Sequence, residues 1–326
     1  MKRGKKMLLL LAVLAVIIVA ALLIPGMFSE AEEETQNTVG VFSVDSSAIT
    51  ELAWTYGEEA LHFVKEEGEW YYADDKAFPA DSSLVSTLAQ SLSMVEATKT
   101  LDQPGASEEY GLDNPACTIT VTTGNTSTQL QFGNQATVGT QRYFSTGDGK
   151  VYLVEKTLYS SFQCGLYDLV QFETLPAMET VTALEVNTDT TTLHIKYRSN
   201  SEGSYAWIAQ GEDGDVVLDT ELTQTFLADI LSLTWASCVN YKADDQELES
   251  YGLVQPAVTA AIHYTQTVNG QTQAGVFQVE FGSLSDSQYY ARIADSEMVY
   301  LVEAELVETL LYTTTDQLRS EEVLTD

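Results

Sequence analysis

Three histidines are the side chains in this sequence best suited to acid–base or metal chemistry. His62 and His194 each lie between apolar neighbours, in Leu61–Phe63 and Leu193–Ile195. Alternation along a strand places such a histidine on the face opposite its apolar neighbours. A catalytic or metal-binding pair is one interpretation, and a half-exposed strand residue is the simpler one. His263 has no partner nearby in the sequence, so we assign no catalytic, cofactor-binding or metal-binding residue.

Short acidic runs form a second group of side chains with chemical potential. Glu212-Asp213-Gly214-Asp215 resembles part of a calcium loop but lacks the remaining ligand spacing and the distal glutamate, so a turn is the simpler interpretation. Asp74-Asp75 and Asp244-Asp245 are typical of solvated pairs. Gly147-Asp148-Gly149-Lys150 indicates a hairpin turn, because no serine or threonine follows the lysine as a phosphate loop requires. The sequence contains no serine elbow, Walker loop or H-E-x-x-H pattern.

The segments that would position these residues are duplicated in the sequence. The repeated motifs are Tyr-Gly-Leu-x-x-Pro at 110–115 and 251–256, Phe-Gly at 132–133 and 281–282, and Val-Tyr-Leu-Val-Glu at 151–155 and 299–303. The offset between equivalent residues grows from 132 near the start of each copy to 148 near its end. Loops absorb such insertions and packed elements do not. We therefore predict two similar domains, at 45–176 and 177–326.

Each copy begins with strand-like segments and continues into an expected helix. Asp81 is the expected N-cap, and Leu84, Leu88 and Leu92 recur at helical spacing on one face. The corresponding residues of the second copy are Asp219, Leu222, Phe226 and Ile230. Because the stripe recurs in both copies, we expect it to pack into the core of each domain.

The Tyr-Gly-Leu motif has a backbone explanation. Gly111 and Gly252 follow short helical turns, where a left-handed residue commonly ends a helix. Pro115 and Pro256 would then open the next strand. The first copy continues with expected strands at 118–122, 129–132, 141–145 and 151–154, followed by a short helix that begins at Glu155, or at Glu303 in the second copy. The predicted fold class is α+β, with two duplicated, mostly antiparallel sheet-plus-helix domains.

The N-terminus indicates a membrane anchor. The charge-free run Met7–Ile24 has 18 residues, and four cations precede it at Lys2, Arg3, Lys5 and Lys6. A helix of this length nearly spans a bilayer, and the cations favour a cytoplasmic N-terminus. We therefore predict an anchor at 1–28, an acidic linker at 29–44 and an extracytoplasmic bulk behind a single transmembrane helix. The alternative is a cleaved signal peptide with a weak processing site at Ser29 and Ala31.

The charge of the chain limits its partners. All 48 acidic residues lie after Ser29, together with 11 of the 15 lysines and arginines, which gives that part a formal charge of −37 (11 − 48). Phosphate binding needs a basic footprint, so nucleic acid is excluded as a partner. Solubility explains this charge most simply, and cation binding is the alternative. Cys117, Cys164 and Cys238 have no metal-site spacing and form no even disulfide framework.

The motifs together resemble a known bacterial family. They are a single N-terminal membrane segment, a tryptophan strand, Pro79-Ala80-Asp81 at a helix start, and then Tyr-Gly-Leu-x-x-Pro, Phe-Gly and Val-Tyr-Leu-Val in order. In this order they resemble the DUF4340 family of envelope proteins, in two tandem copies over residues 45–326. The second copy departs from the pattern at its helix start, which reads Val217-Leu218-Asp219. The family has no established catalytic residues, so none are carried over.

The resemblance also sets the functional expectation. Members of the family occur beside, or fused to, auxiliary components of ABC-2-type transporters. This implies a non-enzymatic, membrane-anchored binding or scaffold protein without a cofactor, with ABC transporter subunits as partners. The alternatives are a stand-alone module that binds an extracytoplasmic or cell-wall ligand, and a hydrolase of an envelope polymer.

Overall fold

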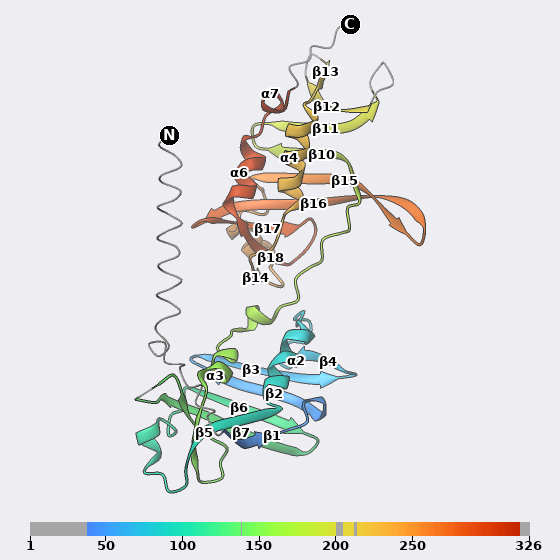
Figure 1. Ribbon diagram of the computed structural model, residues 1–326. Coiled ribbons are helices and arrows are strands. Elements are labelled where there is room, and N and C mark those ends of the chain that lie inside the picture. Colours follow the sequence, from blue (N-terminus) through green and yellow to red (C-terminus); the bar gives the residue numbers. More distant parts are fainter. Residues whose placement is uncertain (1–37, 138, 200–204, 212–213, 320–326) are drawn as a thin grey trace, which may run out of the picture.

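The computed structural model describes residues 38–137, 139–199, 205–211 and 214–319. It contains two nine-stranded sheets, and every strand pair in both is antiparallel. We call the first sheet and its helices lobe one, and the second sheet and its helices lobe two (Figure 1). The expectation of a sheet-rich, mostly antiparallel fold is therefore confirmed.

Lobe one contains nine strands, two helices and three 3₁₀ turns. The strands are β1 (Val39–Ser43), β2 (Ile49–Tyr56), β3 (Glu59–Glu66), β4 (Glu69–Tyr72), β5 (Met94–Leu101), β6 (Cys117–Thr123), β7 (Thr126–Gln135), β8 (Arg142–Ser145) and β9 (Val151–Val154). The helices are α2 (Ser82–Ser91) and α3 (Lys156–Ser161), and the turns are η1 (Ser46–Ala48), η2 (Ser107–Tyr110) and η3 (Leu166–Leu169). Residues 39–43, which the sequence places in the acidic linker, form the edge strand β1.

Lobe two repeats this organisation with longer helices. Its strands are β10 (Thr180–Thr188), β11 (Thr192–Ser199), β12 (Tyr205–Gly211), β13 (Gly214–Val217), β14 (Ser237–Asn240), β15 (Val258–Val268), β16 (Gln271–Ser285), β17 (Gln288–Ile293) and β18 (Val299–Glu303). Its helices are α4 (Thr220–Leu231), α5 (Asp245–Ser250), α6 (Ala304–Tyr312) and α7 (Thr315–Leu318). Helices α4 and α6 pack against each other on one face of the sheet (Figure 1).

The two sheets share one strand order over eight strands. In lobe one the order is β4-β3-β2-β6-β7-β8-β9-β5, and in lobe two it is β12-β11-β10-β15-β16-β17-β18-β14. Trp70 and Trp207 occupy equivalent strands, β4 and β12. Strand β4 pairs with β3, and strand β12 pairs with β11. The ninth strand differs, because β1 extends sheet one beside β5 whereas β13 extends sheet two beside β12.

Alternating side chains build a separate apolar core in each lobe. In β3, Leu61 and Phe63 are buried, and the intervening His62 lies on the other face. The indole of Trp54 stacks on Phe63 with ring centroids 5.6 Å apart. Cys117 is buried in the same core, and Val258 at the equivalent position of lobe two is buried as well. Large buried side chains of this kind dominate the stability of a domain.

The predicted helix caps are confirmed, but the predicted stripes are partly wrong. The Asp81 carboxylate accepts hydrogen bonds from the backbone N–H groups of Ser83 and Leu84 at the start of α2. Leu84 itself is 41% exposed, and the buried face consists of Val85, Leu88, Ala89 and Leu92. At 3.6 residues per turn, Leu84 lies about 90° around the axis from the centre of that face. Helix α4 shows the same error, since Leu222 is exposed while Thr223, Phe226, Leu227 and Ile230 are buried.

The two glycine motifs contact each other in both lobes. Gly111 and Gly252 have φ of 68° and 73°, the left-handed conformation expected at these helix ends. The glycines of the Phe-Gly motifs lie against the carbonyl groups of the tyrosines in the Tyr-Gly-Leu motifs. A Cβ added to Gly133 would meet the carbonyl oxygen of Tyr110 at 2.1 Å, and one added to Gly282 would meet that of Tyr251 at 2.2 Å. The recurrence of both motifs therefore follows from one backbone contact.

Alanine at Gly111 or Gly252 is expected to lower the melting temperature of the fragment 33–326. A side chain in the left-handed conformation costs about 1 kcal/mol. At Gly252 the added Cβ would also approach the Ser283 backbone nitrogen to 2.9 Å, and at Gly111 it would approach the Asn134 side chain to 2.6 Å. Thermal melts monitored by circular dichroism measure the loss. Unchanged melts in both variants would show that the motif serves binding rather than folding.

The predicted anchor at Met7–Ile24 and the processing site at Ser29 and Ala31 lie outside the described residues. Within the part of the chain that the structure describes, no helix has the length and apolar character needed to cross a membrane.

Candidate ligand pocket between helices α4 and α6

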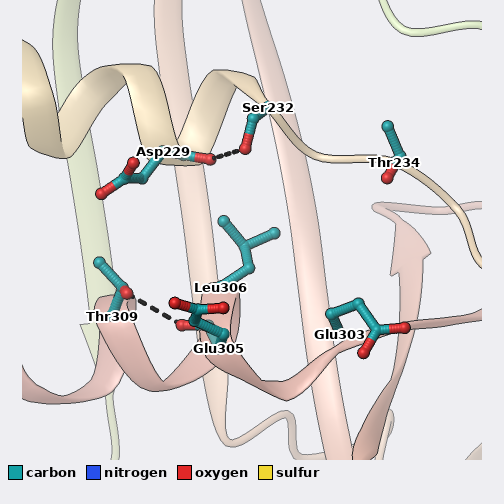
Figure 2. A pocket seen from close by; sticks show the side chains of 7 residues that line it. All are labelled: Asp229, Ser232, Thr234, Glu303, Glu305, Leu306 and Thr309. Carbon is teal, nitrogen blue, oxygen red and sulfur yellow. Dashed lines mark hydrogen bonds between the residues drawn. The ribbon is translucent and has the colours of Figure 1, made fainter. Parts of the chain in front are cut away.

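A cavity of about 350 Å³ opens between the C-terminal end of α4 and the first turns of α6. Its lining comprises Asp229, Ser232, Thr234, Glu303, Glu305, Leu306 and Thr309. Figure 2 shows Asp229 on α4 and Glu305 on the facing helix α6, with Leu306 between the two helices. The pocket combines carboxylates and hydroxyls around one leucine, which is the composition of a polar binding site rather than of a lipid site.

Helix geometry places these side chains. The Ser232 hydroxyl donates to the carbonyl of Asp229 at 2.6 Å, and the Thr309 hydroxyl donates to the carbonyl of Glu305 at 2.9 Å. Both hydroxyls therefore donate to carbonyl groups of their own helix (Figure 2). Helix α4 also points its carbonyl end at the cavity, which carries partial negative charge. Together with the carboxylates, this end favours a cationic group.

A glutamine–glutamate pair borders the pocket and recurs in lobe one. Gln288 Nε2 donates to Glu303 Oε1 at 2.8 Å, and Gln141 Nε2 donates to Glu155 Oε1 at 3.1 Å. In each lobe the glutamine lies at, or one residue before, the start of the strand that precedes the Val-Tyr-Leu-Val strand. The glutamate is the N-cap residue of the helix that follows the Val-Tyr-Leu-Val strand. No sequence motif marks the two glutamines, although their spacing of 147 residues matches the repeat.

Lobe one has a wider, more open hollow at the equivalent place. It is lined by Thr140, Glu155, Lys156, Thr157, Ser160 and Ser161. Lys156 and Thr157 replace Ala304 and Glu305 of lobe two, so the two hollows differ in charge although their elements correspond. Helix α2, with 10 residues against 12 in α4, contributes no lining residue there. The pocket of lobe two is therefore lined by three carboxylates, whereas the hollow of lobe one is lined by one carboxylate and one lysine.

The structure brings His194 and His263 together, although they are 69 residues apart in the sequence. His194 Nε2 lies 3.0 Å from Glu185 Oε1, and His263 Nε2 lies 3.4 Å from the same oxygen. The three side chains come from the adjacent strands β11, β10 and β15 on the solvent face of sheet two. In lobe one, His62 instead lies 3.6 Å from Glu51. Among the described residues, no group of three or more His, Cys, Asp or Glu side chains has the arrangement of a metal site.

The acidic runs singled out in the sequence have local structural roles. Asp244 caps α5 by accepting from the Glu247 N–H at 2.9 Å. The backbone N–H of Ala77 and the hydroxyl of Tyr241 lower the pKa of Asp75 by hydrogen bonding to its carboxylate. Asp215 pairs with Arg198, while residues 212–213 of the calcium-like run lie outside the described chain. The 147–150 segment joins β8 and β9 as a hairpin turn, as predicted.

Burial disfavours the thiolate form of the three cysteines. Burial raises the pKa of the Cys117 thiol to about 12 and those of Cys164 and Cys238 to about 11. All three are free thiols. They are therefore protonated at neutral pH, and a thiol reacts as its thiolate.

Comparison with known families identifies the chain. A family profile described as "Domain of unknown function (DUF4340)" matches residues 70–256. The chain belongs to the DUF4340 family. The DUF4340 match begins in β4 of lobe one and ends at Pro256, just before β15 of lobe two, so it includes both Tyr-Gly-Leu motifs. Comparisons with curated proteins and with solved structures gave no match.

Proposed function

We propose that this DUF4340 protein is a non-enzymatic binding or scaffold protein, anchored in the cell membrane by its N-terminal segment with its bulk outside the cytoplasm. Its partner in this proposal is an ABC-2-type transporter, for which it serves as an auxiliary component. Each lobe is one copy of the DUF4340 unit in tandem. The partner and the envelope location rest on the family resemblance and on the charge pattern of the N-terminus.

The observation that carries the proposal is how the duplicated residues are used. The Tyr-Gly-Leu and Phe-Gly motifs form one backbone contact in each lobe, and the tyrosines of the Val-Tyr-Leu-Val strands are buried. These recurring motifs therefore serve packing. The lobes differ at their surfaces and at their ninth strands, and such differences suit a protein whose role lies in what its surfaces contact.

The acidic pocket of lobe two is the site that we propose for the partner. Asp229 and Glu305 approach from two helices, and the carbonyl end of α4 adds to their negative potential. A lysine or arginine side chain fits both the size of the cavity and its charge. The formal charge of −37 on the outer part would also accelerate encounter with a basic surface.

Membrane fractionation tests the anchor. The full-length protein is expected to remain in the pellet after an alkaline carbonate wash, because the charge-free run Met7–Ile24 would be embedded in the bilayer. Immunoblotting with an antibody to lobe two and mass spectrometry of the N-terminus measure the result. Release of a shortened chain that begins near Glu32 would favour the signal peptide and contradict the anchor.

Co-purification from detergent-solubilised membranes tests the partner. The double variant D229N/E305Q is expected to bind an ABC transporter encoded beside this protein about tenfold more weakly. This loss corresponds to about 1.4 kcal/mol of binding free energy. The variant E108Q/E109Q is the matched control, since it removes the same charge from an exposed turn of lobe one. Equal weakening of binding in both variants would show that the pocket contributes only through the net charge of the protein. Full binding by D229N/E305Q would exclude the pocket, and absence of any transporter in the wild-type sample would favour the stand-alone module.

A further inference from the structure

The segment between the lobes occupies the sequence position of a missing strand. At the offset of 132 that relates the starts of the two copies, residues 171–175 correspond to β1 at 39–43. Strand β1 pairs with β5 along the edge of sheet one. The counterpart of β5 is β14, which ends sheet two and pairs only with β18 among the described strands. Residues 171–175 form no strand.

Side-chain contacts bind this segment to lobe two instead, and Glu173 is at their centre. Its backbone N–H donates to the Tyr300 hydroxyl at 3.0 Å, and its carbonyl accepts from Trp235 Nε1 at 3.1 Å. Its carboxylate Oε2 accepts from the Ser296 hydroxyl at 2.9 Å and from the Tyr300 hydroxyl at 3.1 Å. Backbone and side chain of one residue are thus both bound by lobe two, and Tyr300 contacts both.

The same segment remains bound to lobe one at its other end. The backbone N–H of Gln171 donates to the carbonyl of Pro79 at 2.6 Å, and Val170 bridges to Ala80. Only one residue separates Gln171 from Glu173. So short a span between two bound positions leaves little freedom for the lobes to turn about the segment.

Direct contacts between the lobes support the same arrangement. The Tyr241 hydroxyl of lobe two donates to Asp75 Oδ2 of lobe one at 2.8 Å. The Tyr241 ring meets Phe78 of lobe one edge to face, with ring centroids 5.1 Å apart. Phe78, Val170, Cys238 and Tyr300 form one buried apolar cluster that draws on both lobes. The hydrogen bond to Asp75 raises the pKa of Tyr241 to about 12, so its hydroxyl stays protonated and available as a donor.

We propose that Glu173, Tyr300 and Trp235, together with the Asp75–Tyr241 contact, form a fixed joint that sets the two lobes in one orientation. The inference goes beyond the proposed function and does not depend on the identity of a partner. In lobe one the residue equivalent to Tyr300 is Tyr152, which donates to Asp148 of its own lobe. The two equivalent tyrosines therefore make different contacts, and Tyr300 of lobe two binds the connecting segment.

Hydrogen–deuterium exchange of the full-length protein in detergent tests the bound segment. The amides of Gln171 and Glu173 are expected to exchange slowly in the wild type, because each donates a hydrogen bond. Glu173→Ala should accelerate their exchange at least tenfold, while Thr174→Ala, an exposed neighbour, should leave it unchanged. Ser296→Ala, which removes one of the two carboxylate donors, should give an intermediate acceleration and serves if Glu173→Ala fails to fold. Rapid exchange of both amides in the wild type would overturn the proposal.

Distance measurement tests the single orientation. Spin labels attached through non-natural residues at Thr126 of lobe one and Gln271 of lobe two leave the three native cysteines untouched. Double electron–electron resonance should give one narrow distance distribution in the wild type and a broad one in the Glu173→Ala/Tyr241→Phe double variant. A broad distribution in the wild type would refute the fixed joint. A narrow one in the double variant would show that these contacts do not set the orientation.

Discussion

Alanine at Gly133 or Gly282 is expected to lower the free energy of unfolding by about 3 kcal/mol, the upper range for overpacking a core. The added Cβ would lie 2.1 Å from the Tyr110 carbonyl oxygen, or 2.2 Å from that of Tyr251. Side chains can rotate away from a collision, but these partners are backbone atoms held at the end of a helical turn. The turn itself would have to move, and the left-handed glycine beside it would move with it.

Chemical denaturation of the fragment 33–326 measures this loss. Gly40→Ala is the control, because its added Cβ meets no atom within 4 Å and its φ is not in the left-handed region. Loss at Gly282 should appear in lobe two alone, which hydrogen–deuterium exchange measures lobe by lobe; each lobe contains two tryptophans, so their fluorescence alone does not separate the lobes. Gly133 or Gly282 variants as stable as Gly40→Ala would contradict the backbone contact between the two motifs.

The second large effect is expected at Tyr300. Alanine there should cost about 4 kcal/mol, within the range for removing a buried aromatic ring. Tyr300 is fully buried, and its ring stacks on Trp235 with centroids 4.3 Å apart. The substitution would leave a cavity beside Trp235 and would leave the Glu173 N–H without its acceptor.

Two matched variants separate these contributions. Tyr300→Phe retains the ring and should cost only about 1–3 kcal/mol, the penalty for a buried group that loses its hydrogen-bond partner. Tyr205→Ala, at a tyrosine that is 67% exposed, should change stability by less than about 0.5 kcal/mol. Denaturation midpoints of the three variants decide the order. Equal stability of Tyr300→Ala and Tyr205→Ala would show that the ring is not buried in solution.

The sequence was sufficient to predict helix caps and helix ends, which depend on residues close together in the chain. Asp81 and Asp219 were recognisable as caps, and Gly111 and Gly252 as left-handed helix ends, because each needs only its neighbours in the chain. Each helix stripe was wrong only at its first residue, because Leu84 and Leu222 are exposed whereas the later positions are buried. Spacing alone fits Leu84 or Val85 equally well, and the orientation of α2 toward the sheet decides between them.

Contacts between distant segments could not be predicted in the same way. His194, Glu185 and His263 meet only because β10 lies between β11 and β15, an order that a single sequence does not contain. The pocket between α4 and α6 and the contacts of Glu173 have the same origin. Each depends on which elements become neighbours, and residues up to 166 positions apart meet in the interlobe joint, as Asp75 and Tyr241 do.

The shared strand order also has a consequence for folding kinetics. In each lobe the first strand of the common core pairs with a partner far along the chain: Leu52 in β2 with Val121 in β6, and Leu184 in β10 with Ile262 in β15. Such pairing gives a high contact order, and the loop between the strands must close before the central ladder can form. Among the strands that the structure describes, none pairs across the lobes. Each sheet therefore closes as its own slow step, and lobe one can finish folding while lobe two is still being synthesised.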